Sequence, residues 1–228
     1  MAHSRPTQPK TPDYLPDEVK HGTTTLAMIF KGGVVLAADN RASAGYMVAS
    51  PTAKKLHPLA KKTAMSIAGS VSDAQYVVKL MRAEINLFEL NRGRDMSASA
   101  IANLLSNVLY GQYRKYFPYF IGPILAGFDH NGPHVFPMDI AGSMTEEPWA
   151  ATGSGSPYAI GVMEAMYEPE LEESKAVSIV LLGLRSAIKK DIATGDGIDV
   201  LVITDAGIKK LTKAEIKKSL GTKYPFKE

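Results

Sequence analysis

Three consecutive threonines, Thr23, Thr24 and Thr25, follow Gly22 where a polar N-terminal stretch meets the first apolar run. A threonine hydroxyl is a poor nucleophile near neutral pH, but the free α-amine of an N-terminal threonine can serve as its base. The ordinary pKa of such an amine, about 7.7 to 8.0, suits that role. The chain must then be cut before Thr23, and Gly22 leaves that peptide bond unshielded by a side chain. Threonine is also a common strand residue, so a catalytic interpretation requires chemical partners elsewhere.

Other familiar catalytic motifs are absent from the sequence. It has no G-x-S-x-G, H-E-x-x-H, G-x-x-x-x-G-K-[ST] or strand-following G-x-G-x-x-G pattern, and its five histidines lack metal-ligand spacing. It has no cysteine, which excludes thiol catalysis and disulfides and suits a reducing compartment. We therefore expect a cytoplasmic protein with no metal and no organic cofactor.

Composition indicates one globular domain behind a disordered leader. The chain has 228 residues, 45% of them hydrophobic, and residues 1–22 form the stretch with disordered character. The net charge of +3 is carried by the lysine-rich C-terminal end, without a basic stripe interleaved with aromatics, so we expect no nucleic-acid binding. No apolar run reaches the roughly 20 residues that span a bilayer, so we expect no membrane segment.

The elements that must position Thr23 begin with a hairpin. Apolar, β-rich runs at 23–30 and 34–39 flank a glycine-containing turn, and another short strand is expected at 64–68. Ser72, with Gln75 three positions later, then predicts the start of a helix. Apolar residues at helical spacing indicate two consecutive amphipathic helices. These residues are Val77, Leu80, Met81, Ile85 and Phe88 in the first helix, and Ile101, Leu104, Leu105, Val108 and Leu109 in the second.

The second half of the sequence repeats this order. Its predicted elements are a hairpin of strands at 121–128 and 134–138, a helix at 158–167 begun by Ser156 and Pro157, a fourth helix closed by Gly195, and a strand at 198–204. Strands, two helices, strands, two helices and a strand make an α+β arrangement in which antiparallel sheets pack together under outer helices. We predict a four-layer αββα sandwich.

Several short blocks resemble one known family in both order and spacing. The matching blocks are Gly22-Thr23-Thr24-Thr25, residues 39–45, Lys55, residues 67–69, residues 141–143, residues 151–157 and residues 185–197. Together they resemble archaeal-type proteasome β subunits, and the resemblance runs from Gly22 to about Thr204. It implies the four-layer sandwich of the N-terminal-nucleophile hydrolases.

The resemblance implies a catalytic centre built on three side chains. Thr23 is the implied nucleophile and, after autocatalytic cleavage at Gly22-Thr23, the new N-terminus. Lys55 is the implied cation that lowers the pKa of the threonine hydroxyl and relays its proton, and Asp39 is implied to hold Lys55. The backbone N–H of Gly69 matches the family's oxyanion-hole donor, which stabilises the tetrahedral intermediate.

Three further residues match positions that support the free amine and the threonine hydroxyl in this family: Ser154, Asp191 and Thr194. Each also has a purely structural explanation. Ser154 precedes a predicted helix, and the segment from Asp191 to Thr194 fits a helix C-terminus. The family commonly has serine where this chain has Thr194, and both residues keep a hydroxyl.

Lys54 is an alternative to Lys55 as the catalytic lysine. Adjacent residues on a strand point to opposite faces, so only one of the two can face Thr23. The sequence alone allows either lysine, and the match to the family block favours Lys55.

The positions that match the family's substrate pocket carry small or apolar side chains: Ala42, Ser43, Ala53, Ile67 and Val71. Such a pocket predicts cleavage after hydrophobic residues, because a charged side chain would lose its solvation there without gaining a partner. His57 lies two residues after Lys55 and is expected on the same face. When protonated, it could admit some acidic residues as a secondary activity.

The resemblance thus implies the catalytic β subunit of a proteasome core particle, an ATP-independent threonine endopeptidase. It further implies a propeptide at 1–22 and a single catalytic domain at 23–228 with a basic tail. The implied partners are other β subunits in a heptameric ring, proteasome α subunits, unfolded polypeptide substrates and an ATP-dependent unfoldase acting through the α ring. Two alternatives remain: a non-catalytic structural ring subunit, and an N-terminal-nucleophile amidohydrolase that acts on a small amide.

Overall fold

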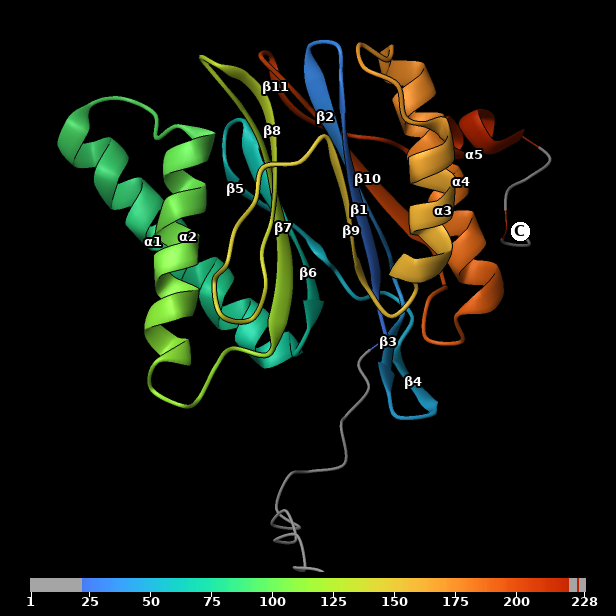
Figure 1. The fold of residues 1–228 in the computed structure, drawn as a ribbon, viewed down its shortest axis with the longest axis horizontal. Coiled ribbons are helices and arrows are strands. Elements are labelled where there is room, and N and C mark those ends of the chain that lie inside the picture. Colours follow the sequence, from blue (N-terminus) through green and yellow to red (C-terminus); the bar gives the residue numbers. More distant parts are fainter. Residues whose placement is uncertain (1–21, 222–224, 226–228) are drawn as a thin grey trace, which may run out of the picture.

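Two antiparallel β-sheets pack face to face, and helices cover both outer sides (Figure 1). The structure is a computed structural model that describes residues 22–221 and Pro225. The leader expected at 1–22 thus lies outside the described residues except for Gly22, whereas the basic C-terminal end is described as far as Gly221. The order of helices, sheet, sheet and helices confirms the predicted αββα sandwich.

The first sheet carries Thr24 and Thr25 on an interior strand, with Thr23 directly before it. Its strands are, in spatial order, β11 (Gly207–Lys210), β10 (Ile198–Thr204), β2 (Gly33–Asp39), β1 (Thr24–Phe30) and β9 (Trp149–Gly153). β1 and β2 form the predicted hairpin, and its turn places Gly32 at a φ of 86°, a conformation that glycine adopts without steric cost. The C-terminal end of β2 therefore brings Asp39 back beside the start of β1.

The second sheet supplies the opposite wall of the sandwich. Its strands are, in spatial order, β5 (Leu56–Ala60), β6 (Thr63–Gly69), β7 (Ile121–Asp129) and β8 (Gly132–Pro137). A separate small hairpin, β3 (Ala42–Ala44) with β4 (Met47–Ser50), connects the two sheets beside the start of β1.

In the described part of the chain, five helices lie outside the sheets (Figure 1). They are α1 (Val71–Arg92), α2 (Ala98–Tyr113), α3 (Ser156–Met166), α4 (Glu173–Lys190) and α5 (Lys213–Leu220). α1 and α2 cover the second sheet, and α3, α4 and α5 cover the first. α5 has a capping box in which Thr212 and Glu215 satisfy each other's backbone N–H groups.

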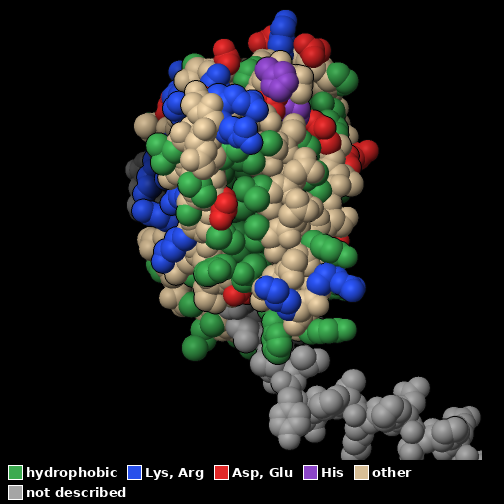
Figure 2. All heavy atoms as spheres, turned by 90° about the vertical axis from the view of Figure 1, so that its left-hand side faces the viewer, with side chains coloured by type: hydrophobic (Ala, Val, Ile, Leu, Met, Phe, Trp, Pro, Cys, Tyr) green, Lys and Arg blue, Asp and Glu red, His purple; other side chains and the backbone are tan. Residues whose placement is uncertain are grey.

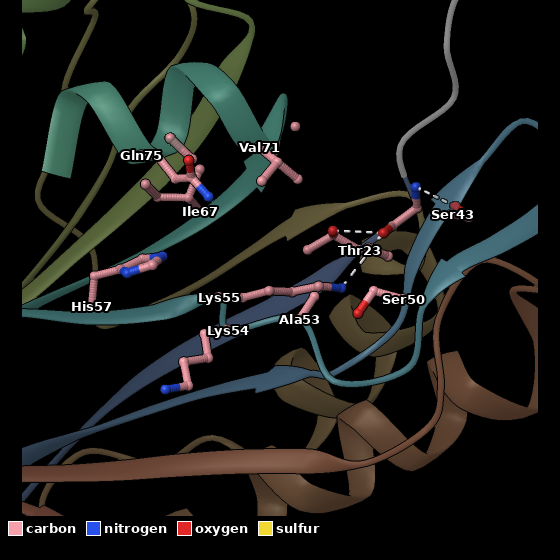
Figure 3. A pocket seen from close by; sticks show the side chains of 14 residues that line it. Thr23, Ser43, Ser50, Ala53, Lys54, Lys55, His57, Ile67, Val71 and Gln75 are labelled. Carbon is pink, nitrogen blue, oxygen red and sulfur yellow. Dashed lines mark hydrogen bonds between the residues drawn. The ribbon is translucent and has the colours of Figure 1, made fainter.

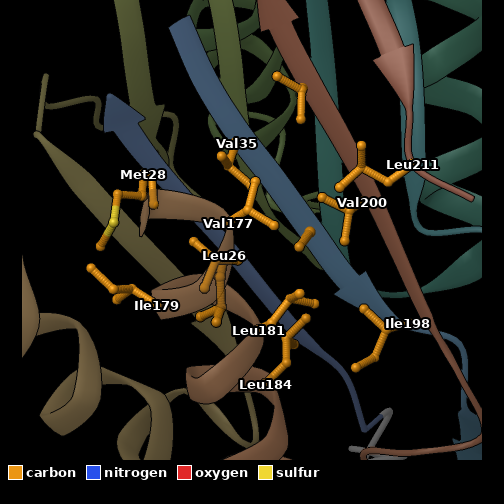
Figure 4. Packing of buried hydrophobic residues seen from close by; sticks show 14 of the residues in the cluster. Leu26, Met28, Val35, Val177, Ile179, Leu181, Leu184, Ile198, Val200 and Leu211 are labelled. Atoms are coloured by element: carbon orange, nitrogen blue, oxygen red, sulfur yellow. The ribbon is translucent and has the colours of Figure 1, made fainter. Parts of the chain in front are cut away.

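Both faces of β1 are buried, which explains why residues 26–30 are continuously apolar rather than alternating. Leu26 and Met28 pack under α4 against Val177 and Leu181 (Figure 4). Ala27, between them, faces the other sheet in a third cluster of buried residues. Packing on two sides fixes the register of β1, because a shift by one residue would exchange the side chains of two different cores.

Several predicted boundaries were wrong. α1 begins at Val71, and its N-cap is Ser70, which accepts a hydrogen bond from Asp73 N; the prediction placed this cap at Ser72. α3 begins one residue early, at Ser156, after Gly155. α4 ends at Lys190 rather than continuing to Gly195. The sequence analysis also omitted β3, β4, β9 and β11, and it placed the start of β5 too early, because Lys54 and Lys55 precede this strand.

Within the described residues, no helix is both long and apolar enough to cross a membrane. The same part of the chain holds no cluster of histidine, aspartate and glutamate side chains suited to a metal ion.

Candidate active site

Thr23 lies one residue before β1 and is almost fully buried beside the carbonyl group of Gly22. Its hydroxyl donates a hydrogen bond to that carbonyl oxygen, with 2.6 Å between Oγ1 and O. The candidate nucleophile therefore lies next to the peptide bond that would have to be cut (Figure 3).

Gly22 fits its site because it has no side chain. Its N–H donates to the Ser43 hydroxyl on β3 at 2.8 Å. A Cβ atom added to Gly22 would overlap the backbone and side chain of Ala193. Close packing by Ala193, together with the Ser43 hydrogen bond, therefore restricts the position before Thr23 to glycine.

The Lys55 side chain points toward Thr23, whereas that of Lys54, which also borders the pocket, points away from Thr23 (Figure 3). Lys55 Nζ lies 2.7 Å from Asp39 Oδ1 and 3.5 Å from the Gly22 carbonyl oxygen. We predicted that both lysines lie on one strand and therefore point to opposite faces. That prediction was wrong, because both precede the start of β5 at Leu56. Of the two, Lys55 is nevertheless the buried side chain.

Asp39 is fully buried and held from several sides. Beyond Lys55, it accepts backbone N–H groups from Thr24 at 2.9 Å, Arg41 at 3.0 Å and Gly195 at 2.9 Å. Burial raises the pKa of Asp39 above its ordinary value, while Lys55 and the backbone donors oppose that shift. Burial likewise lowers the pKa of Lys55 against the attraction of Asp39. A lysine with a lowered pKa gives up a proton more readily, which suits a proton relay.

The nitrogen of Thr23 faces a second carboxylate network. It donates to Ser154 Oγ at 3.3 Å, and Ser154 Oγ in turn donates to Asp191 Oδ2 at 2.6 Å. The Thr194 hydroxyl donates to the same Asp191 oxygen, also at 2.6 Å. The structure thus brings these three residues together around the atom that would become the free amine.

Gly69 ends β6 on the wall of the same pocket. Its φ is 123°, and a Cβ atom there would overlap the Phe120 carbonyl oxygen. Only glycine therefore fits without strain at this point. Its role as an oxyanion donor stays a prediction.

A pocket of about 400 Å³ opens beside Thr23. It is lined by every residue predicted for it: Ala42, Ser43, Ala53, Ile67 and Val71. Ser50, Ala74 and Gln75 also line it and were missed, although helical spacing from Val71 indicates the last two. His57 lines it too, but burial and the Arg82 charge lower the pKa of His57. Any acceptance of acidic residues would therefore be confined to acidic pH.

Arg41 was not predicted to have a role, yet it fastens the loop that carries Thr194. Its guanidinium makes a two-point contact with Asp196, with Nε at 2.7 Å and Nη2 at 3.0 Å, and it donates to the Ile192 carbonyl oxygen at 2.7 Å. Such planar, bidentate geometry is specific to arginine. The sequence signal was available, because Arg41 lies two residues after Asp39 in a matched block.

Comparison with known proteins gives one consistent result. A family model described as "Proteasome subunit" matches residues 19–203, a range that contains all the candidate site residues. "Proteasome subunit beta" of Methanoregula boonei is 43% identical over 200 residues, covering 87% of this chain and 93% of that protein. The proteins of the same name from Archaeoglobus profundus and Haloferax volcanii are 42% and 44% identical over 207 and 191 residues. These two alignments cover 90% and 84% of this chain, and 95% and 77% of the relatives.

Proposed function

Because this chain belongs to the proteasome subunit family, as a β subunit with the N-terminal-nucleophile hydrolase fold, we propose that it is a threonine endopeptidase whose nucleophile is Thr23. One observation carries the proposal. The Thr23 hydroxyl, the Gly22 carbonyl group and the buried pair of Lys55 with Asp39 meet at a single point.

The first step is self-cleavage between Gly22 and Thr23. The Thr23 oxygen bonds to the Gly22 carbonyl carbon, its proton passes by way of Lys55, and the carbon–nitrogen bond breaks as the nitrogen takes up a proton. Water then hydrolyses the resulting ester, which releases residues 1–22 and leaves Thr23 with a free amine and a free hydroxyl.

The mature enzyme repeats this chemistry on other polypeptides. The Thr23 hydroxyl attacks a substrate carbonyl, an acyl ester forms, and the amine activates the water that releases it. The Gly69 N–H stabilises the tetrahedral intermediate. Ser154, Asp191 and Thr194 hold the amine, and no metal or organic cofactor enters the reaction.

The chain is a proteasome core subunit, and we propose heptameric rings of β subunits that stack on rings of α subunits, in the cytoplasm. Exposed apolar side chains support contacts with other subunits. The face formed by α1 and α2 shows apolar side chains among charged ones (Figure 2), and they include Tyr76, Leu87, Leu90, Tyr110 and Tyr113. Unfolded polypeptides delivered through the α ring by an ATP-dependent unfoldase are the proposed substrates.

Two alternatives give different experimental results. A purely structural ring subunit would assemble without needing the buried pair of Lys55 with Asp39, because ring contacts use only the surface. A small-amide amidohydrolase would use the same nucleophile but would not form large rings. The size of the purified complex separates the second alternative from our proposal.

The direct test compares hydrolysis of a fluorogenic peptide by the wild type, Thr23→Ala and Thr23→Ser. We expect no hydrolysis by Thr23→Ala and measurable hydrolysis by Thr23→Ser, because serine keeps a hydroxyl and an amine in the same place. Hydrolysis by Thr23→Ala at the wild-type rate would reject Thr23 as the nucleophile.

A further inference from the structure

Thr24 carries a buried hydroxyl to which the reaction above assigns no role. Its side chain is fully buried, and its Oγ1 lies 2.7 Å from the Oγ1 of Thr194. The two residues are 170 positions apart in the sequence. A buried hydroxyl without a partner is costly, so this contact satisfies both groups.

The direction of this hydrogen bond follows from the neighbouring bonds. The single hydroxyl hydrogen of Thr194 is donated to Asp191, with 2.6 Å between the oxygens. Thr194 can therefore only accept from Thr24, so Thr24 is the donor. The chain of donation runs from Thr24 through Thr194 to Asp191.

Asp191 connects this chain to the Thr23 nitrogen. The Asp191 oxygen that accepts from Thr194 also accepts from Ser154 at 2.6 Å. Because the hydrogen of Ser154 is held there, a lone pair of Ser154 Oγ is left to accept from Thr23 N. Hydrogen bonds in such a chain strengthen one another.

Two further features tie Thr24 to the site. Its backbone N–H donates to Asp39 at 2.9 Å, so this one residue contacts both carboxylate networks of the site. Gly155 leaves room for the contact, because a Cβ atom there would overlap the Thr24 hydroxyl and approach that of Thr194 to 3.0 Å.

We propose that Thr24 is a positioning residue, whose hydroxyl fixes Thr194 and Asp191 so that Ser154 presents an acceptor to the amine of Thr23. This inference rests on the proposed function of Thr23. Thr24 itself touches no reacting atom and acts through the other hydroxyls.

The neighbouring Thr25 provides a matched control. It is equally buried on the same strand, and its hydroxyl is also hydrogen-bonded, to Thr152 at 2.8 Å and Ser66 at 3.1 Å. These partners lie outside the network that holds Thr23. Thr25→Val therefore makes the same chemical change in a similar environment without touching the proposed chain.

The experiment measures kcat and KM of the complexes for a fluorogenic peptide, per subunit whose intact mass shows a free Thr23. We expect Thr24→Val to lower kcat by about 2- to 10-fold, the effect of one lost hydrogen bond, with KM unchanged. Thr24→Ser should restore kcat, and Thr25→Val should match the wild type. Equal rates for Thr24→Val and Thr25→Val, or a Thr24→Ser variant as slow as Thr24→Val, would overturn the proposal.

A double variant tests whether Thr24 acts through Thr194. If it does, the double variant Thr24→Val/Thr194→Val should have the same kcat as Thr194→Val alone. A double variant whose loss of kcat equals the product of the two single losses would overturn the proposal. Failure of Thr24→Val to process while Thr25→Val processes would count in its favour, because the same chain holds the Thr23 nitrogen before the cut. Should Thr24→Val not fold, Thr24→Ser against Thr24→Ala makes the same comparison. An active wild type with inactive Thr23→Ala upholds the proposed function whatever the result at Thr24.

Discussion

Replacing Lys55 by methionine should destabilise the protein strongly, whereas the same change at Lys54 should not. Lys55→Met removes the ammonium group that lies 2.7 Å from the fully buried Asp39 and leaves a side chain of similar length. The carboxylate would then stay in the interior with only backbone donors. Lys54 is exposed and its side chain points away from Thr23, so Lys54→Met is the matched control.

The size of the effect follows from the contacts that remain. Removing one partner of a buried ion pair costs about 3 to 5 kcal/mol. Asp39 keeps its three backbone donors, so we expect the lower end of that range, about 3 kcal/mol at pH 8. An exposed substitution such as Lys54→Met should stay within about 0.5 kcal/mol.

The destabilisation by Lys55→Met should decrease as the pH falls. Burial already raises the pKa of Asp39 from its ordinary value of 3.8, and losing Lys55 removes the charge that opposes this shift. A carboxyl group with a raised pKa in the folded state favours folding in its protonated form. That contribution is fully present below pH 3.8 and is lost as the pH rises through the folded-state pKa. The destabilisation by Lys55→Met should therefore be smaller at pH 5 than at pH 8.

Urea unfolding followed by tryptophan fluorescence measures this effect, because Trp149 in β9 is the only tryptophan in the sequence. All variants would carry Thr23→Ala, so that every sample keeps its leader. Adding Asp39→Asn to Lys55→Met should recover part of the loss by removing the unpaired charge. If Lys55→Met unfolds at the same urea concentration as Lys54→Met at pH 8, the buried ion pair does not carry the energy that we assign to it.

Three further outcomes are expected. Gly22→Ala should slow leader removal on the order of 100-fold, because its Cβ atom would overlap Ala193 and displace the scissile carbonyl. Adding Ala193→Gly should restore part of the rate. Leader removal by Gly22→Ala at the wild-type rate in a time course would contradict this. Fluorogenic peptides that differ only before the cut should be cleaved faster after leucine or tyrosine than after arginine or glutamate, and the opposite order would reject the pocket assignment. Burial disfavours the charged imidazole of His134, but hydrogen bonds to Glu146 and Asp129 outweigh that effect and raise the pKa of His134. The stability that His134 adds should then be present below about pH 6.5 and fade as the pH rises through the raised pKa. In urea unfolding, the difference in free energy of unfolding between the wild type and His134→Gln should therefore shrink as the pH rises. A difference in free energy of unfolding that grows with pH would contradict the ion-pair interpretation.

The sequence predicted the hairpin of β1 and β2 because both strands are buried on two faces, so residues 26–30 and 34–38 are continuous apolar runs. β9 was missed for the opposite reason. It is five residues long, and its strand conformation comes from pairing with β1, more than 120 positions away, as in the pair Leu26 with Ala151. The cap of α1 was misplaced because Ser70 and Ser72 both fit the local pattern, and only the end of β6 at Gly69 selects the first.

The residues of the candidate site were identified by matching blocks, but their geometry could not be. Lys55 precedes its strand, so the alternation of side chains along a strand does not explain why it faces inward. Its inward orientation is set by the ion pair with Asp39, which the fold places beside it. The contact between Thr24 and Thr194 depends on the packing of the loop that follows α4 against β1, and no local sequence pattern predicts such a long-range contact.

The intact mass of the purified chain tests the central claim most directly. The account predicts that the wild-type subunit has the mass of a chain that begins at Thr23, and that Thr23→Ala purified in the same way keeps residues 1–22. A wild-type subunit that keeps its leader in the assembled complex, or a Thr23→Ala subunit that loses it there, would contradict the claim that Thr23 cuts the chain before itself.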